Sequence, residues 1–469
     1  MTRRFVRIKN TLFGNKAFYI TVVTLVVPMI IQHTITNFVS LLDNIMVGRV
    51  GTLEMSAVGI INQLLLVFNL CIFGGVSGAG IFSAQFAGAK NHDGVRQCFR
   101  VKILTSVLLT AVAVTLFSVF PDRLINLYIA EDSSPADALA TFTFAADYLK
   151  IMLVGLLPFA LSQSYASTLR ELGQTKLPMI ASVISIITNL VLNYILIFGH
   201  LGFDAMGVKG AAIATVIARF VEFFIIMLIT HIKRGDFEFI KGAYRSLYVS
   251  KSLLLDILKR GSPLIINETM WSAGMAVLMQ CYSVRGLDVV AAQNISSTVS
   301  NLFNVIFYSM GGAISIMVGQ YLGALKNRYA LHTSYKLITF SVMTSVVMGS
   351  ILASLSSVIP LLYNTTDSVR MIAERFLVVV GLFMPIYSFA HGCYFTLRSG
   401  GRTVLTTLFD SGYTWFICVP IAFVLANFTS LPILPLFIII QCIDIIKCIL
   451  GFIFVKKGIW IRNIVNDKT

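Results

Sequence analysis

The chain has 469 residues, of which 57% are hydrophobic and only 12% are charged, and its mean hydropathy is +0.84. Soluble domains carry about 25% charged residues, so this composition excludes a soluble enzyme or binding module. The net charge of +15 would indicate a nucleic-acid partner in a soluble protein, but the positions of the charges exclude that interpretation here, as described below.

Apolar stretches long enough to cross a hydrocarbon core of about 30 Å recur along the whole chain. We predict twelve transmembrane helices, and therefore an all-α polytopic membrane protein. In chain order the predicted helices lie at roughly 17–42, 54–83, 101–120, 142–168, 177–199, 208–230, 253–283, 289–319, 333–362, 372–397, 404–427 and 432–455.

An even number of spans places both termini on the same side of the membrane. Most of the 36 Lys and Arg residues lie in the termini and the even-numbered loops, and segments rich in Lys and Arg stay in the cytoplasm. We therefore expect both termini in the cytoplasm and a multi-pass protein of a prokaryotic plasma membrane. The positive charge then sets the orientation of the chain in the membrane and attracts anionic lipid. We therefore expect no nucleic-acid partner.

The two halves of the sequence repeat each other. When the halves are aligned, Gln85–Ala89 falls on Gln320–Ala324, and Thr168–Thr175 falls on Thr396–Thr403. Repeated six-span halves of the same orientation are typical of transporters in which two lobes rock about a central cavity. We predict a cytoplasmic tail, an N-terminal six-helix lobe, a cytoplasmic linker, a C-terminal six-helix lobe and a second tail, at 1–16, 17–230, 231–252, 253–455 and 456–469.

Short motifs recur in a fixed order along both halves. The first two spans contain D-x-x-M-V-G-R-x-G (Asp43–Gly51), then A-V-G-I, then G-x-x-x-G-A-G-I-F-x-A-Q-x-x-G-A (Gly74–Ala89). The sixth span contains G-A-A-x-A-T (Gly210–Thr215), and the second half contains V-V-A-A-Q-N-I and G-Q-Y-L-G-A. Together these motifs resemble the multidrug and toxic compound extrusion (MATE) family over essentially the whole chain.

The resemblance implies a secondary active antiporter that exports lipophilic or cationic drugs, or other organic cations, in exchange for H+ or Na+. A nucleotide-binding loop of the G-x-x-x-x-G-K-[ST] type is absent from the sequence, so we expect no ATP-driven step. We also expect a monomer that is not an enzyme and needs no cofactor besides the coupling ion. Two alternatives stay open: a lipid-linked oligosaccharide flippase or exporter of the same superfamily, and an exporter of an endogenous metabolite.

Acidic residues inside the predicted spans need an explanation, because a charge at the centre of a membrane costs about 2.5–3.5 kcal/mol or more. Asp43 has no basic residue at helical spacing, since Arg49 is six residues away, and its counterpart in the repeat is Leu278. Asp43 therefore either reaches water at the outer end of its span or binds a coupling ion.

The fifth span places Asn189 and Asn193 four residues apart, on one face of a helix. Amides serve as oxygen ligands or hydrogen-bond partners. Matching positions form the cation site of the N-terminal lobe in the MATE family, so the resemblance implies a coupling site of Asp43, Asn189, Asn193 and Thr215, with Na+ a candidate ligand of the first three. Some members have a second aspartate where Asn193 stands, so the single carboxylate here leaves proton coupling open.

Four further residues are candidates for binding substrate or a second cation: Glu268, Asp410, Tyr387 and His391. Glu268 lies near a glutamate that some branches of the family use, or it is solvated from the cytoplasm. Asp410 is either a helix cap or a cavity carboxylate, and His391 is either a hydrogen-bonded core residue or a proton relay. Tyr387 aligns with an aspartate of other branches, which argues against their cation site in this C-terminal lobe.

Two pairs of opposite charge lie within single spans. Arg219 and Glu222 are three residues apart, as are Asp444 and Lys447, and residues at this spacing share a helix face. We predict an ion pair within each helix. Alignment of the sixth span with the twelfth superposes the two pairs with reversed signs, which favours a structural role in both lobes, with gating or substrate passage as the alternative.

Overall fold

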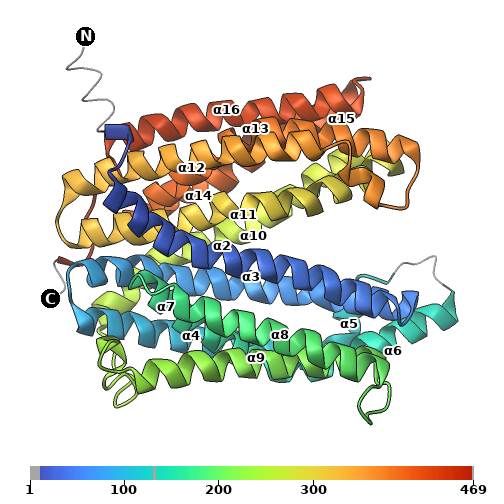
Figure 1. Cartoon of the computed structure of the whole chain (residues 1–469), viewed down its shortest axis with the longest axis horizontal. Coiled ribbons are helices and arrows are strands. Elements are labelled where there is room, and N and C mark those ends of the chain that lie inside the picture. The colour runs from blue at the N-terminus through green and yellow to red at the C-terminus, as the bar shows by residue number, and fades with distance from the viewer. Residues whose placement is uncertain (1–10, 130–133, 467–469) are drawn as a thin grey trace. The chain divides into compact units, whose positions relative to one another are not determined.

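A computed structural model describes residues 11–129 and 134–466, which form helices and contain no strand (Figure 1). The helices of the first half are α2 (Lys16–Gly48), α3 (Thr52–Gly88), α4 (His92–Val119), the short α5 (Pro121–Asn126), α6 (Pro135–Met152), α7 (Leu156–Glu171), α8 (Lys176–Phe198) and α9 (Gly207–Ile232). Those of the second half are α10 (Lys251–Ser283), α11 (Leu287–Gly323), α12 (Asn327–Leu355), α13 (Asp367–Ser399), α14 (Thr403–Thr407), α15 (Val419–Phe428) and α16 (Ile433–Lys457).

Eleven helical stretches of the described chain are long and apolar enough to cross a membrane, with α6 and α7 forming the single stretch Pro135–Glu171. The remaining predicted span is α10, which has 33 residues like α2. Its apolar content is lower because it begins in charged residues and carries Asn267 and Glu268 in its middle. The all-α polytopic architecture is confirmed, and the crossing by α10 stays a prediction.

Two compact units divide the chain. The N-unit contains Ile31–Ser83 and His92–Leu258, and the C-unit contains the described residues up to Ile30 together with Ala84–Asn91 and Lys259–Asn466. The predicted lobes, 17–230 and 253–455, follow the linear repeat. In the structure the first half of α2 and the last turns of α3 belong to the C-unit, and the first turns of α10, up to Leu258, belong to the N-unit.

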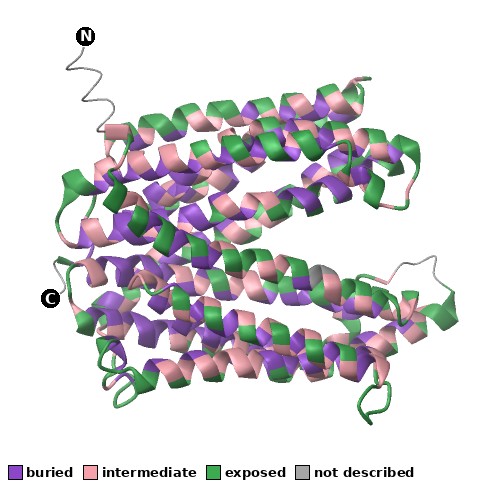
Figure 2. Ribbon diagram, viewed as in Figure 1, coloured by how far each residue is buried: buried purple, intermediate pink, exposed green. Residues whose placement is uncertain are grey.

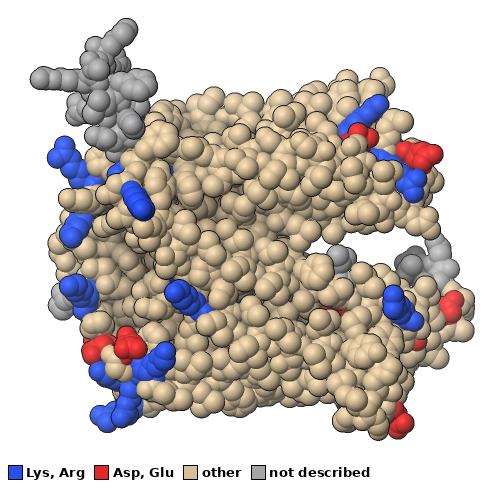
Figure 3. Space-filling view, viewed as in Figure 1, with Lys and Arg blue, Asp and Glu red and all other residues tan. Residues whose placement is uncertain are grey.

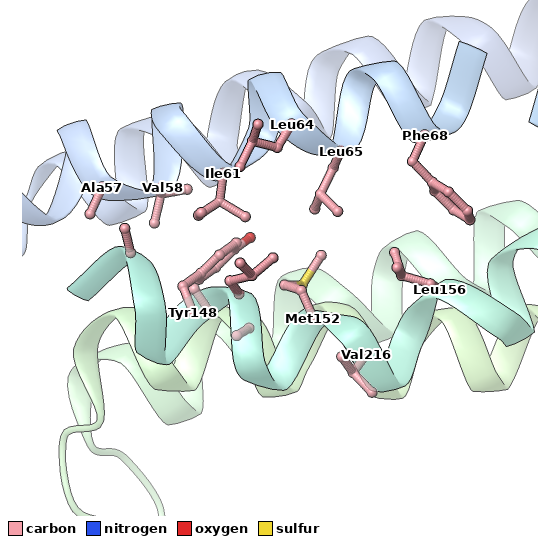
Figure 4. Packing of buried hydrophobic residues seen from close by; sticks show 14 of the residues in the cluster. Ala57, Val58, Ile61, Leu64, Leu65, Phe68, Tyr148, Met152, Leu156 and Val216 are labelled. Carbon is pink, nitrogen blue, oxygen red and sulfur yellow. The ribbon is translucent and has the colours of Figure 1, made fainter. Parts of the chain in front are cut away.

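The core of the N-unit forms where α3 packs on the α6–α7 stretch and α9. Ala57, Val58, Ile61, Leu64, Leu65 and Phe68 recur along one face of α3, at the spacing of three and four residues that marks one side of a helix. Figure 4 shows Ile61, Leu65 and Phe68 pointing toward the helices that carry Tyr148, Met152 and Leu156. This packing fixes α6 and α9 in the positions from which they contribute to the site described below.

The repeated glutamine–glycine motif packs on its own copy inside the C-unit. A Cβ atom added at Gly88 would collide with the backbone of Gln320, and one added at Gly323 would collide with the backbone of Gln85. Gly88 and Gly323 correspond to each other when the two halves are aligned, so the contact is reciprocal, as a two-fold relation requires. Glycine at both positions lets the ends of α3 and α11 approach backbone to backbone.

The segment after α16 packs against the same motif. Trp460 is fully buried. The Gln85 side chain donates from Nε2 to the carbonyls of Ser399 and Arg462 at 3.0 and 3.1 Å, and its Oε1 accepts from the Ile464 N–H at 2.9 Å. The described part of the predicted tail 456–469 is therefore docked on the C-unit through specific hydrogen bonds.

The outward faces of the helices are exposed over long stretches (Figure 2), and many of the exposed side chains are large and hydrophobic. Leu108 is 64% exposed and Ile187 is 56% exposed. Soluble proteins rarely leave large apolar patches in water, whereas lipid tails cover them. Figure 3 shows Lys, Arg, Asp and Glu gathered mostly toward the ends of the helices, as expected for segments that cross a bilayer.

Candidate functional site

Three helices of the N-unit bring the predicted coupling residues together: α2 with Asp43, α8 with Asn189 and Asn193, and α9 with Thr215. α8 ends at Gly199, whose φ of +76° suits glycine, and the chain returns as α9. Gly210 lies against the backbone of Leu196, where a Cβ atom would collide. This close approach of α8 and α9 places Thr215 beside Asn189.

Asp43, Asn189, Asn193 and Thr215 form one continuous hydrogen-bond network. Asn193 Nδ2 donates to Asp43 Oδ1 at 2.7 Å and to Asn189 Oδ1 at 3.1 Å. Asn189 Nδ2 contacts Thr215 Oγ1 at 3.2 Å, and the Thr215 hydroxyl donates to the Ala211 carbonyl at 2.9 Å. Both asparagines are buried, so the network holds the Asp43 carboxylate against α8.

The Asn189 amide fits the network better with its nitrogen and oxygen exchanged. In that orientation its nitrogen donates to both Asp43 oxygens, at 3.1 and 3.2 Å, and its oxygen accepts from Thr215 at 3.2 Å, while the hydrogen bond from Asn193 Nδ2 to Asn189 is lost. Amide orientation is assigned from such networks because nitrogen and oxygen look alike. In either orientation the partners of the Asp43 carboxylate are amides, and among the described residues it forms no ion pair with Lys or Arg.

One acceptor of the network has no partner. Asn193 Oδ1 is buried and accepts no hydrogen bond from the described residues. Buried polar atoms are almost always satisfied, and each exception needs an explanation. An unsatisfied oxygen beside a carboxylate matches the hard-oxygen ligand set of a small cation.

Two neighbouring features complete the surroundings of Asp43. The hydroxyl of Tyr148, a buried residue of α6, is a hydrogen-bond partner of Thr215, and Asp43 is among its electrostatic neighbours. A groove of about 460 Å³ between α2 and α8 begins one residue from the network on both helices; its lining is Leu42, Ile45, Met46, Arg49, Leu190, Val191, Tyr194 and Phe198. The groove is mostly apolar and runs toward the C-terminal ends of both helices.

Arg219 and Glu222 are electrostatic neighbours, as their spacing predicts, but no ion pair in direct contact joins them among the described residues. Arg219 donates to the Gly155 carbonyl at 3.3 Å and stacks 5.0 Å from the centre of the Phe159 ring. Gly155 ends a 3-10 turn, Leu153–Gly155, that interrupts the α6–α7 stretch. This contact joins α9 to the break between α6 and α7, and the first charged neighbour of Glu222 is Arg170.

Lys447 forms its direct ion pair with Asp410, while Asp444, its predicted partner on the same helix, is an electrostatic neighbour. Lys447 Nζ lies 2.7 Å from Asp410 Oδ1, a residue of the neighbouring π-helical turn Leu408–Gly412. Asp410 Oδ2 accepts from Asn267 Nδ2 at 3.1 Å. Asp410 is therefore the carboxylate of a charged centre inside the C-unit, not a helix cap. A spacing of three residues shows that Asp444 and Lys447 share a face of α16. It does not show that another helix places Asp410 next to Lys447.

The remaining candidates lie in the C-unit and have separate partners. Glu268 is half-buried, with Arg398 and Asp410 as its charged neighbours. Tyr387 donates to Gln441 Oε1 at 2.6 Å. His391 packs against Phe307, Tyr308 and Phe395, and its Nε2 is buried without a hydrogen-bond partner among the described residues. The expectation of a hydrogen-bonded core histidine is therefore wrong for Nε2.

Sequence analysis missed a buried ion pair in the N-unit. Lys102 has a fully buried side chain, and its Nζ lies 2.5 Å from Glu171 Oε2 and 3.1 Å from the hydroxyls of Ser167 and Thr168. Lys102 stands at the start of a predicted span and resembles an ordinary cytoplasmic lysine. The signal that could have identified it is its position between apolar residues, in V-K-I-L.

A family model and individual relatives each match most of the chain. The model of the MatE family matches residues 28–195 and 263–428, once in each half of the repeat. A probable multidrug resistance protein NorM of Thermotoga maritima is 25% identical over 443 residues, which cover 94% of this chain and 93% of that protein. The probable multidrug resistance protein YoeA of Bacillus subtilis is 26% identical over 419 residues, which cover 88% of each chain.

Solved structures share the fold. A multidrug resistance MATE family transporter of the MOP superfamily, in an outward-facing conformation, superposes with a TM-score of 0.85 at 20% identity over 95% of this chain and 96% of that chain. A MATE crystal structure in a straight conformation gives the same TM-score and identity over 95% and 97%. The two-lobed helical fold therefore extends over nearly the whole chain.

Proposed function

Since the chain belongs to the MatE family of multidrug efflux transporters, we propose that it is a secondary active antiporter that exports lipophilic or cationic organic compounds in exchange for H+ or Na+. Members of this family are transporters and not enzymes. The observation that carries the proposal is the Asp43 network, in which a carboxylate within a membrane helix has amide partners and no ion pair among the described residues.

Coupling follows from the charge of Asp43. A carboxylate inside a membrane must pair, protonate or reach water. Asp43 and the free Asn193 Oδ1 offer acceptor oxygens to Na+, with Asn189 and Thr215 beside them. Protonation of Asp43 would neutralise the same charge. Binding of either ion changes the hydrogen bonds between α2 and α8, and α2 therefore responds to the bound ion.

α2 has a built-in weak point for this response. Pro28 lies inside the helix and removes one backbone hydrogen bond. The helix passes from the C-unit to the N-unit after Ile30, two residues beyond the proline. We propose that cation loading at Asp43 bends or shifts α2, lowers the affinity for the organic compound and favours its outward release, since antiport requires the two ligands to stabilise different states.

The proposal includes the cellular setting. The chain is a multi-pass protein of a prokaryotic plasma membrane, with both termini in the cytoplasm, and it works as a monomer. The distribution of Lys and Arg supports this orientation.

Reconstituted vesicles test the function directly. The purified protein should expel a fluorescent lipophilic cation when a proton or a sodium gradient is imposed, and Asp43→Asn should abolish the gradient-driven movement. Asp204→Asn, at an exposed loop position, serves as the control and should leave efflux unchanged.

Two results would contradict the proposal. If Asp43→Asn transports as well as the unmodified chain under both gradients, Asp43 is not the coupling residue. If no organic cation moves but a lipid-linked oligosaccharide crosses the bilayer, the flippase alternative replaces the antiporter.

A further inference from the structure

The charged centre of the C-unit holds a carboxylate and an ammonium group in direct contact. Lys447 of α16 reaches Asp410 at 2.7 Å, with side chains only 14% and 18% exposed. Phe409 and Tyr413 flank the ammonium, whose nitrogen lies 5.5 and 5.9 Å from the ring centres. Aromatic faces attract cations, so the site surrounds a monovalent cation with one contacting carboxylate and two rings, and Asp444 is a second acidic neighbour of the ammonium.

The other oxygen of Asp410 has the same kind of partner that Asp43 has. Asn267, which is 1% exposed, donates to Asp410 Oδ2 at 3.1 Å and to the Tyr394 hydroxyl at 3.3 Å. Asn267 is itself held by Ser411, whose N–H and hydroxyl donate to its Oδ1 at 3.3 and 2.7 Å. Each unit therefore contains a carboxylate anchored by a buried asparagine, and the ammonium distinguishes the two.

Irregular backbone presents this carboxylate to α16. Two π-helical turns, Leu408–Gly412 and Thr414–Cys418, interrupt the helix that carries Asp410, and such turns are frequent at functional sites. His391 adds a second signal, since Asp410 and Lys447 are its electrostatic neighbours and its Nε2 is buried without a partner among the described residues.

The repeat places the same contact in the N-unit with different chemistry. When the two halves are aligned, Asp410 corresponds to Ser182 and Lys447 corresponds to Glu222. Ser182 and Glu222 are hydrogen-bond partners. A contact between a hydroxyl and a carboxylate in one half is thus replaced by an ion pair in the other, so the ammonium in the C-unit is an addition at a repeated structural position.

We propose that the Lys447 ammonium is a tethered counter-ion that fills the cation position of an Asp410–Asn267 site. The C-unit then binds no free cation, and removal of the Lys447 charge opens a site for one monovalent cation, Na+ or H+. The reason is that the Asp410 carboxylate lies inside a membrane helix and must bind another cation or a proton when the Lys447 ammonium is removed. This inference does not depend on the role of Asp43.

The test compares cation binding by the purified full-length chain and its variants. Sodium binding is measured by equilibrium dialysis with a radioactive tracer, and proton uptake is measured by titration over the range in which Lys447 stays protonated. Lys447→Met should gain one equivalent of bound Na+ or H+ per chain over the unmodified protein. The double variant Lys447→Met with Asp410→Asn should lose that gain.

A matched control removes the same charge from the same helix. Lys456 stacks on Phe452 at 5.7 Å, and no ion pair is found for it among the described residues. Lys456→Met should bind cations like the unmodified protein. The proposal is overturned if folded Lys447→Met gains neither cation, or if its gain persists after Asp410→Asn.

Stability gives a second readout if Lys447→Met folds poorly. A ligand that binds the folded state raises stability with its concentration, so added NaCl or lowered pH should raise the melting temperature of Lys447→Met more than that of its Asp410→Asn double variant. Choline chloride at equal ionic strength is the reference salt. Equal responses of the two variants would also overturn the proposal. Failure of Asp43→Asn in the efflux assay leaves these comparisons unaffected, so the two proposals are tested separately.

Discussion

At the scale of single residues, the network around Asp43 depends on Asn193. This side chain is 1% exposed, donates to Asp43 at 2.7 Å and retains a free buried oxygen. It can therefore act on a bound cation in two ways, as a donor to the ionised carboxylate and as a ligand oxygen. The two roles have opposite consequences for Na+ and for H+.

Replacement of Asn193 by alanine should therefore reveal the coupling ion. A hydrogen bond to a charged group contributes about 1.5–3 kcal/mol, which corresponds to roughly tenfold or more in affinity. If Na+ is the ion, loss of a ligand oxygen raises the sodium concentration for half-maximal efflux. If H+ is the ion, loss of a donor to the carboxylate lowers the required proton concentration. An unchanged half-maximal concentration for both ions would contradict the assigned network, and Asn44→Ala is the exposed control.

The buried pair of Lys102 and Glu171 should be critical for stability. Glu171→Gln leaves a fully buried ammonium with neutral partners and no counter-charge from residue 171, and the loss of one charge of such a pair costs about 3–5 kcal/mol. Thermal unfolding in detergent should show the loss, and adding Lys102→Met should recover part of it. Lys241→Met breaks an exposed pair and should change little. Equal melting temperatures for Glu171→Gln and the unmodified chain would contradict this assignment.

The sequence predicts which polar residues come together where a residue has no partner of opposite charge or polarity on its own helix. Asp43 has no basic residue at helical spacing. Asn189 and Asn193 are polar side chains in an otherwise apolar helix, so they need polar partners. The contact among the three could therefore be predicted from the sequence and the family resemblance. Arg219 and Lys447 have near neighbours of opposite charge, yet each selects a partner from another segment. That choice depends on a broken helix at Gly155 and a π-helical turn at Asp410, which hydrophobic periodicity does not show.

At the scale of helices, the reciprocal contact between the ends of α3 and α11 depends on the absence of two side chains. Gly88 and Gly323 each face a backbone segment of the other helix with no space for a Cβ atom. Helices in a membrane associate largely through such close packing of small residues. The contact therefore stabilises the C-unit only while both positions remain glycine.

Gly88→Ala and Gly323→Ala should both lower the melting temperature, by similar amounts, because overpacking costs about 1–3 kcal/mol. Gly59 provides a control on the same helix, since a Cβ atom there would meet nothing within 4 Å. Gly59→Ala should leave stability unchanged or raise it, because alanine favours a helix. If Gly88→Ala is as stable as Gly59→Ala, the backbone contact is not formed in the membrane.

At the scale of the whole molecule, composition and the internal repeat were sufficient to predict a helical membrane protein with two related halves. They were not sufficient to divide it into units. α2 and α3 each contribute to both units, whereas a repeat detected along the sequence assigns each helix to one half. Packing between segments distant in sequence determines which residues belong to each unit. The sequence repeat does not show this packing.

The orientation of the molecule gives a prediction at this scale. A protease site inserted in the linker 231–252, and another appended to the C-terminus, should both be cut in inside-out vesicles and protected in right-side-out cells, because both lie on the Lys-rich side. An inserted site in the loop around Asp204 should show the reverse pattern. Cleavage of the linker and the C-terminus from opposite sides would mean that α10 to α16 do not cross the membrane an even number of times.

The docking of Gln85 sets an order of events during biosynthesis. This side chain leaves the ribosome long before its partners Ser399, Arg462 and Ile464, which follow it by 314, 377 and 379 residues. While translation continues, the end of α3 must wait in the membrane with its amide group unsatisfied or hydrated. The C-unit therefore cannot be completed before Ile464 is made, and a chain truncated before Arg462 would leave Gln85 without two of its three partners.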